Sequence, residues 1–158
     1  MIYAIAAIDS ERGLANEQGI PWQGLLPTDI NHFREETKGK TVIMGFATYQ
    51  EFEKPLPHRR NIVVTTKAAN VRPGFELQRD IKKFLKEVEE DVWIIGGAGL
   101  FASVLDSVDE LDITIIHRNF GCTKFFPEFS RDFEKYYTSE TMTENNIEFQ
   151  FTRWKRKN

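Results

Sequence analysis

The chain contains the stretch Val92-Trp93-Ile94-Ile95-Gly96-Gly97-Ala98-Gly99. Four successive apolar residues are typical of a strand that is covered on both faces. The glycines that follow let the backbone turn sharply or approach a ligand closely, and a helix is predicted from Gly99 to about Leu105. A buried strand that passes through glycines into a helix is the repeating unit of an α/β sheet.

The same pattern recurs on both sides of this stretch. Further strands are predicted at Met1–Ile8, Thr41–Met44, Asn61–Thr65 and Leu111–Ile116. Further helices are predicted from Thr28, as the N-cap, to about Thr37, from Thr48 to Phe52, and from Arg79 to Glu90. Residues 147–151 alternate apolar and polar, which is typical of a half-exposed strand, and we expect this strand to pair with Tyr136–Thr141 across Glu144-Asn145-Asn146. The sequence therefore predicts a single α/β domain over residues 1–158, with a mostly parallel central sheet flanked by helices and a C-terminal antiparallel hairpin.

Composition narrows the class of protein. The 158 residues suffice for one domain with a real core, and the net charge of −3 disfavours nucleic acid as the main partner. Cys122 is the only cysteine, so no internal disulfide is possible, which suits a reducing compartment. The apolar run at the N-terminus is too short to span a membrane and lacks the pattern of a signal peptide. We expect a cytoplasmic protein without a membrane partner.

Asp29 is the most informative single residue, because it stands in the apolar and aromatic segment from Ile20 to Phe33. An ionised carboxylate accepts hydrogen bonds and donates none, so it can hold two parallel N–H donors of a flat heterocycle. Phe33 lies four residues further on and shares a helix face with Asp29, and Ile30 and Phe33 would give that face apolar walls. We expect no other carboxylate of the first half in a dry cleft. The plainer interpretation is an acid that favours a helix N-terminus, with Phe33 in the core.

Two strand–glycine–helix junctions suit a ligand with two phosphates. Gly97, Gly99 and Ala102 match G-x-G-x-x-A, but no acid follows at about 20 residues, so a standard Rossmann fingerprint is rejected. Gly45 and Thr48 form the second junction. Residues 65–67, Thr-Thr-Lys, end a third strand with hydroxyls and a cation. Taken singly, each of these features is better explained as an ordinary strand-ending turn.

The stiff segment Pro55-Leu56-Pro57-His58-Arg59-Arg60 could anchor an acidic group, since arginine binds carboxylates in bidentate fashion. An ordinary surface arginine beside a turn is the alternative. His32, His58 and His117 show no metal-like spacing with acids or with Cys122, so we expect each to be solvated or structural and we predict no metal site.

Taken in order, these motifs resemble the dihydrofolate reductases of the bacterial type over essentially the whole chain. The resemblance rests on the following segments: Ile5-Ala6-Ala7, Pro21-Trp22, Leu26-Pro27-Thr28-Asp29 with Phe33, Val42-Ile43-Met44-Gly45 with Thr48-Tyr49, Pro55 to Ile62, Ile95-Gly96-Gly97 with Leu100-Phe101, Leu111 to Thr114, and Phe126-Pro127. Any one of them is weak, but their common order makes chance agreement very improbable.

The resemblance implies that a hydride passes from NADPH to C6 of 7,8-dihydrofolate and that N5 gains a proton, which gives tetrahydrofolate. It implies a monomer that antifolate inhibitors bind. It assigns catalytic roles to Asp29, Trp22 and Thr114, with Asp29 accepting from the 2-amino group and the N3 side of the pterin and Thr114 supporting it. The residues implied to bind substrate are Ile5, Ala7, Asp29, Ile30, Phe33, Phe52, Leu56, Arg59, Ile95 and Thr114, with Arg59 on the glutamate tail.

The residues implied to hold the cofactor are Ala7, Ile20, Gly45, Phe46, Thr48, Thr65, Thr66, Lys67, Ile95, Gly96, Gly97, Ala98, Gly99, Leu100 and Phe101. The resemblance also implies a cis peptide between Gly96 and Gly97, a rare bond outside proline. It places Trp22 on a mobile loop, from about Asp9 to Gln23, that covers the nicotinamide.

Three features depart from the family pattern. Phe46 stands where the family usually has a basic residue, so we predict a reduced preference for NADPH over NADH unless Arg60 or Lys67 compensates. Trp22 and Asp29 are seven residues apart, a longer spacing than in many bacterial members, which would reshape the loop and the pocket entrance. Residues 121–123, Gly-Cys-Thr, replace an acid that often contacts the mobile loop, which leaves loop gating open.

Three other interpretations compete with the reductase. A pyrimidine reductase of riboflavin synthesis shares the fold and the cofactor but would not need Asp29, Thr114 and Arg59 in these contexts. A catalytically idle folate or nucleotide binder would bind ligand without oxidising the cofactor. A purely structural α/β domain would leave the order of the motifs unexplained.

Overall fold

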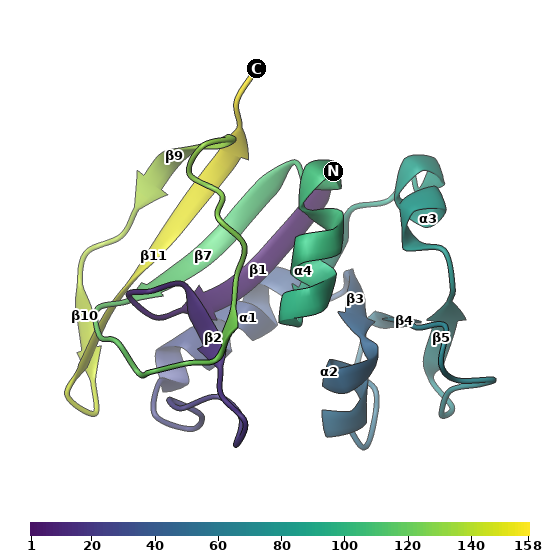
Figure 1. Cartoon of the computed structure of the whole chain (residues 1–158), viewed down its shortest axis with the longest axis horizontal. Helices are drawn as coiled ribbons and strands as arrows, with labels where there is room; N and C mark the ends of the chain where they lie inside the picture. Colours follow the sequence, from purple (N-terminus) through teal and green to yellow (C-terminus); the bar gives the residue numbers. More distant parts are fainter.

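The computed structural model describes all of residues 1–158, and its main feature is one nine-stranded sheet (Figure 1). Its strands are, in spatial order, β10 (Met142–Glu144), β11 (Ile147–Arg156), β7 (Glu110–Ile116), β1 (Ile2–Ile8), β6 (Val92–Gly96), β3 (Thr41–Gly45), β4 (Arg60–Val64) and β5 (Phe75–Gln78), and β9 (Phe133–Thr138) also pairs with β11. Every pair from β7 to β5 is parallel. The pairs that involve β11 are antiparallel. The predicted α/β architecture is confirmed.

Helices cover both faces of this sheet. They are α1 (Pro27–Thr37), α2 (Phe46–Glu51), α3 (Ile81–Glu87) and α4 (Ala98–Val104), and a short 3-10 helix follows α4 at Leu105–Ser107. In the view of Figure 1, α4 lies in front of β1 and α1 lies behind the sheet. None of these helices is long and apolar enough to cross a membrane.

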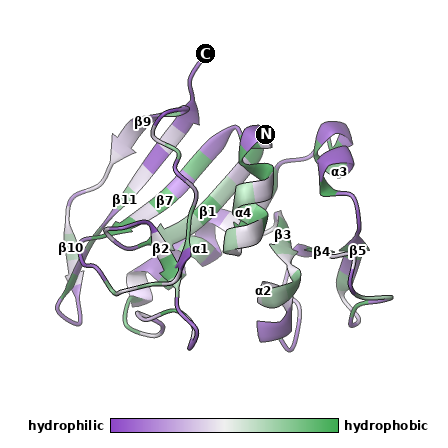
Figure 2. Ribbon diagram, viewed as in Figure 1, coloured by the Kyte–Doolittle hydropathy of each residue, from purple (hydrophilic) through white to green (hydrophobic).

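The central strands carry the core on both faces. β1, β6 and β3 each have parallel neighbours on both sides, so their near-continuous apolar runs are expected. One cluster joins Ile43 and Ile94 to the buried Leu85 of α3 and Phe101 of α4. A second cluster, built from other residues of the same strands, packs against α1 and α2. Figure 2 shows the hydrophobic colour concentrated on β1 and α4.

α1 differs from the other helices, because its only buried residue, Thr37, is polar, whereas the buried residues of the others belong to the hydrophobic core. The predicted Thr28 cap is wrong: Leu26 is the N-cap, it makes no side-chain capping bond, and Pro27 opens the helix. Thr28 lies inside the first turn, where its hydroxyl donates to Glu144 Oε2 at 2.8 Å. Glu144, which is distant in the sequence, therefore accepts the hydrogen bond of the hydroxyl that was expected to cap the helix.

The C-terminal hairpin is confirmed, but its arms differ from the prediction. The turn at Asn145 and Asn146, both with positive φ, joins β11 to the short β10. Residues 136–138 belong to β9, which pairs with the far half of β11 and ends before the turn. Sequence periodicity also missed β5 and the two-stranded sheet of β2 (Gly13–Ala15) and β8 (Lys124–Phe125). Strands this short offer too few residues for a period to emerge.

Candidate active site

Asp29 lies at the start of α1, opposite β7. Thr114 of β7 donates its hydroxyl to Asp29 Oδ1 at 2.6 Å. Burial raises the pKa of Asp29, although the Thr114 bond and the nearby His32 oppose this rise. The other oxygen, Oδ2, forms no hydrogen bond inside the chain, so the carboxyl keeps acceptor capacity for a ligand. The structure therefore brings the predicted pair of Asp29 and Thr114 together and leaves one carboxyl oxygen without a partner in the chain.

Apolar side chains surround this carboxyl. Ile5 is buried, whereas Ala7, Phe33, Phe52, Leu56 and Ile95 are half-buried on the same side of the sheet. Ile30, next to Asp29, is 38% exposed. Half-buried apolar groups in contact with the core form a wall that a flat ring can cover. The predicted substrate residues thus lie around one surface.

Arg59 lies at the other end of α1. Its Nε donates to the hydroxyl of Thr37 at 3.0 Å, and its Nη1 and Nη2 donate to the carbonyls of Pro57 and Arg34 at 2.7 and 3.0 Å. These bonds fix the guanidinium while leaving further N–H groups free. Residues 29 and 37 are about 12 Å apart along a helix axis. A ligand that reaches from Asp29 to Arg59 therefore runs along α1.

The two glycine junctions meet at the C-terminal ends of β3 and β6. Met44 and Gly96 are paired residues, and the Thr48 hydroxyl faces the Gly96–Gly97 peptide, which is cis as the resemblance implied. Gly96 has φ +135°, a conformation that a side chain would strain. A Cβ on Gly99 would meet nothing within 4 Å, so the start of α4 is open. These features fit a dinucleotide that passes close over backbone.

The third strand end carries Thr65, Thr66 and Lys67. The Thr65 hydroxyl accepts from Lys67 N at 2.9 Å, and the side chains of Thr66 and Lys67 are exposed. Phe46 is half-buried against Tyr49, with ring centroids 5.7 Å apart, and supplies no charge. Lys67 therefore supplies an exposed cation on this part of the edge.

Three residues suggested to contact the cofactor, Arg60, Leu100 and Phe101, have their side chains elsewhere in the structure. Arg60 begins β4, at the opposite edge from Gly45, where Glu76 and Glu90 engage its guanidinium. Because β3 and β4 run parallel, Arg60 at the start of β4 lies at the opposite end from Gly45, which precedes Phe46. Arg60 therefore cannot compensate for Phe46. The side chains of Leu100 and Phe101 are buried in the core, so their residues can meet a ligand only through the backbone.

Trp22 is 5% exposed and packs on Phe120 at a centroid distance of 5.2 Å, within a cluster that also contains Leu26 and Ile116. Ile20, two residues earlier, is exposed. The added residues before Asp29 touch the hairpin, because Asn145 Nδ2 donates to the carbonyl of Leu25 at 2.7 Å. The longer segment is therefore fastened to the C-terminal turn.

Asp9 corrects the expectation that Asp29 is the only enclosed carboxylate of the first half, since Asp9 is 2% exposed. It accepts from the backbone N–H groups of Gly13, Glu11 and Phe120 at 2.7, 2.9 and 3.0 Å. Burial alone would raise the pKa of Asp9, but these three donors outweigh it and hold the pKa below its usual value. Asp9 therefore ties the loop after β1 to the 120–122 segment and is no ligand group.

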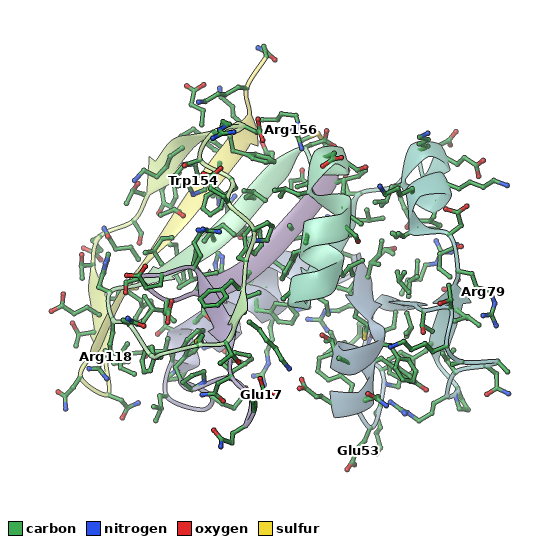
Figure 3. All side chains as sticks on the ribbon, viewed as in Figure 1. Glu17, Glu53, Arg79, Arg118, Trp154 and Arg156 are labelled. Carbon is green, nitrogen blue, oxygen red and sulfur yellow. The ribbon has the colours of Figure 1, made fainter.

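Cys122 lies beside Asp9. Burial and the Asp9 charge raise the pKa of its thiol to about 11, so it is a poor nucleophile at neutral pH. On the same loop the Thr123 hydroxyl donates to Glu17 at 3.0 Å, and Figure 3 shows Glu17 at the lower edge of the molecule, after β2. Polar contacts thus replace the acid that the resemblance implied at residues 121–123.

His32 is structural, one of the two roles expected for it, but it lies close to acids that the sequence spacing did not indicate. Its Nε2 lies 2.8 Å from Asp112 Oδ1, and the ligand atoms of His32, Glu36 and Asp112 all lie within 4.8 Å of one another. Sequence spacing missed this group because Asp112 is distant in the chain. Arg153 already bonds Glu36 at 2.6 Å and lies 3.9 Å from Asp112. With His32 protonated, the two positive groups, His32 and Arg153, balance the two carboxylates, Glu36 and Asp112, in an ion-pair network.

Two shallow surface hollows lie elsewhere. One is lined by residues that include Glu11, Arg12 and Cys122, and the other by residues that include Phe84 and Glu89. Neither contains Asp29. Convergent polar groups and an apolar wall therefore define the site around Asp29.

Comparisons with known proteins agree with this geometry. The family model described as dihydrofolate reductase matches residues 1–156. The dihydrofolate reductase of Bacillus subtilis is 33% identical over all of this chain and 96% of its own length, and that of Staphylococcus aureus is 33% identical over 80% of this chain and 77% of its own.

A solved structure of dihydrofolate reductase from Enterococcus faecalis, complexed with NADP(H) and RAB-propyl, superimposes with a TM-score of 0.89. It is 28% identical and covers 100% of this chain and 97% of its own. The family model, the full-length relatives and the shared fold lead to one conclusion: the chain belongs to the dihydrofolate reductase family.

Proposed function

We propose that this chain reduces 7,8-dihydrofolate to tetrahydrofolate with NADPH, and that the reaction takes place on the surface between Asp29 and the Gly96–Gly97 junction. The observation that carries this proposal is the half-buried Asp29 carboxyl, which Thr114 holds at 2.6 Å among apolar side chains. Family membership and the full-length relatives support the same activity.

Asp29 binds and orients the pterin in this proposal. Its ionised carboxylate accepts from the 2-amino group and from the N3 side of the ring, because it can take two parallel N–H donors. The Thr114 hydroxyl donates a hydrogen bond to one oxygen of Asp29, and this bond fixes the plane of the carboxyl. Phe33, Leu56 and Ile95 cover the ring and exclude water. The glutamate tail extends along α1 to Arg59, which is already held by three acceptors.

NADPH, when bound, supplies the hydride that adds to C6 of the pterin. The residues proposed to hold it are Gly45 and Thr48 on one junction, Gly96, Gly97 and Gly99 on the other, and Thr65 to Lys67 on the third strand end. Two features support this placement: a Cβ on Gly99 would meet nothing within 4 Å, and the positive φ of Gly96 is one that residues with a side chain rarely adopt.

The proton for N5 comes from water, and Asp29 polarises the ring without handing over the proton itself. Burial raises the pKa of the Asp29 carboxyl, and its ionised form attracts a positive charge that develops on the ring. Trp22 and the loop anchored by Asp9 form the other side of the site. Their contacts therefore control how completely water is excluded.

The test is the absorbance of NADPH over time with purified protein, with and without dihydrofolate, and with NADH in parallel. Loss of absorbance only when protein and dihydrofolate are both present is the expected result. No loss with folded protein would favour the idle folate or nucleotide binder, which the motif set and the family match otherwise disfavour.

We further propose that the protein acts as a cytoplasmic monomer and that antifolates compete with dihydrofolate at Asp29. A single cysteine with a raised pKa supports a reducing compartment. Size-exclusion chromatography with light scattering tests the monomer. Competition between dihydrofolate and a 2,4-diaminopyrimidine tests the shared site.

A further inference from the structure

α1 is held against the sheet by three polar contacts that follow one face of the helix. Asp29, His32 and Glu36 are three and four residues apart and therefore share a face. Their partners are, in the same order, Thr114 at 2.6 Å, Asp112 at 2.8 Å and Arg153 at 2.6 Å. Beside the apolar contact of Phe33, α1 thus docks on the sheet through a polar ladder, a row of three side-chain contacts that includes Asp29.

The sheet side of this ladder is equally regular. Asp112 and Thr114 alternate along β7, so both side chains face α1. Arg153 and Phe151 of β11 are the paired residues of Asp112 and Thr114. The His32 ring also stacks on Phe151, with centroids 4.2 Å apart and an interplanar angle of 18°. His32 is therefore clamped between a carboxylate on one strand and an aromatic ring on the next.

Asp112 requires a positive partner. It is 4% exposed, its Oδ1 bonds His32, and its Oδ2 is buried without any hydrogen bond. The nearest other cation, Arg153, lies 3.9 Å away and is engaged with Glu36. A buried carboxylate is costly unless it is paired. Burial alone would lower the pKa of His32, but the bond to Asp112 and its charge outweigh this and raise it.

We propose that His32 is a positioning residue for Asp29: clamped between Asp112 and Phe151, its imidazolium fixes the face of α1 that carries Asp29 and places a positive charge one helical turn from the carboxylate. This inference rests on the proposed role of Asp29 in binding the pterin. It adds a group that touches neither substrate nor cofactor and acts only through Asp29.

The charges around the two residues come from several elements. Glu36 lies on α1 itself, Asp112 on β7 and Arg153 on β11. Asp112 and Glu144 of β10 both disfavour the ionised form of Asp29, whereas His32 favours it. Among these charged neighbours His32 is the one that lowers the pKa of Asp29, which burial and the two acids raise. Loss of its proton raises the pKa of Asp29.

The experiment is an NMR titration of the full chain labelled with carboxyl-¹³C aspartate and ring-¹⁵N histidine. It compares the wild type with His32→Gln, Asp112→Asn and His117→Gln. The amide introduced by His32→Gln can still donate to Asp112 but carries no charge. His117 serves as the matched control, because it is exposed and its Nε2 lies 2.8 Å from Gln150 Oε1. Dihydrofolate-dependent NADPH oxidation by the wild type is measured first, so that failure of the proposed function is seen separately.

The expected result is that His32→Gln moves the Asp29 midpoint to higher pH, that Asp112→Asn moves the His32 midpoint to lower pH, and that His117→Gln moves neither. In the wild type, the Asp29 signal should show a second inflection at the His32 midpoint, which tests the coupling even if a variant fails to fold. An unshifted Asp29 midpoint in folded His32→Gln, or a wild-type Asp29 signal without that inflection, would overturn the proposal.

Discussion

The groups around Asp29 act on the pKa of its carboxyl in opposite directions. Burial and two nearby acids favour its neutral form, whereas the Thr114 hydroxyl and His32 favour its charged form. The opposed influences leave a raised pKa and one oxygen available to a ligand. A carboxyl in such a balance is suited to hold a heterocycle whose own protonation changes during the reaction.

Replacing Asp29 by Asn should keep the fold but reduce turnover at neutral pH by roughly 10²-fold or more. Asn presents one acceptor and one donor group, so it cannot accept both N–H groups of the pterin edge. Steady-state rates with NADPH and dihydrofolate measure the effect. Asp106→Asn, an exposed aspartate in the turn after α4, is the matched control. Near-normal rates in Asp29→Asn would contradict the role given to this residue.

Phe46 sets the second residue-level prediction. Arg60 does not replace the missing cation, since it lies at the opposite edge and is paired with Glu76 and Glu90. The wild type should therefore discriminate only weakly between NADPH and NADH. Phe46→Arg should raise the ratio of their kcat/KM values by roughly tenfold or more, because a charge-assisted bond contributes about 1.5–3 kcal/mol.

Phe46→Leu is the control for that experiment, because it alters packing on Tyr49 without adding charge. Lys67→Ala should lower the same ratio, since Lys67 is the exposed cation at the end of β4. A wild type that strongly prefers NADPH would refute the expectation, as would a Phe46→Arg variant whose ratio stays unchanged.

The elements around the site were predictable to different degrees, for physical reasons. Apolar runs such as Thr41–Met44 and Val92–Ile95 are specified locally, because strands buried on both faces need little more than apolar residues. α1 was predicted nearly to its ends, but its docking was not: His32 and Asp112 meet across 80 residues of chain. Such a contact depends on strand order, which periodicity does not encode.

The loop after β1 illustrates the same limit. Its short pairing between β2 and β8 leaves no periodic signal, and Asp9 looked like a turn residue in the sequence. In the structure Asp9 collects three backbone N–H groups from two segments. The Gly96–Gly97 peptide, by contrast, was correctly anticipated, because the resemblance and not the residue pattern implied it.

Asp9→Asn should loosen this loop and lower the free energy of unfolding by about 1–3 kcal/mol, because buried N–H groups lose a charged acceptor. Urea unfolding followed by tryptophan fluorescence measures the change, again with Asp106→Asn as the control. Limited proteolysis should cut the variant sooner within residues 10–23. Unchanged stability together with unchanged cleavage would show that the Asp9 contacts do not hold the loop.

Over the whole molecule, three groups near the site make stability depend on pH, and the signs of their contributions differ. The pKa of Asp9 is lowered in the fold, so its contribution is present above its unfolded pKa and is lost as the pH falls through the folded value. The pKa of Asp29 is raised, so its ionisation costs stability as the pH rises from the unfolded pKa through the folded one. The pKa of His32 is raised, so its contribution is present below the unfolded pKa and disappears as the pH rises through the folded value.

These signs together place the greatest stability at weakly acidic pH, between the ordinary pKa of a carboxyl, about 4, and that of histidine, about 6.5. The free energy of unfolding in urea, measured from pH 4 to pH 9, should therefore fall on the alkaline side. His32→Gln should flatten that fall, because it removes the group whose proton is lost there, whereas His117→Gln should leave it unchanged. A wild type whose stability is flat above pH 6 would mean that the polar ladder beneath Asp29 holds α1 without the charge on His32.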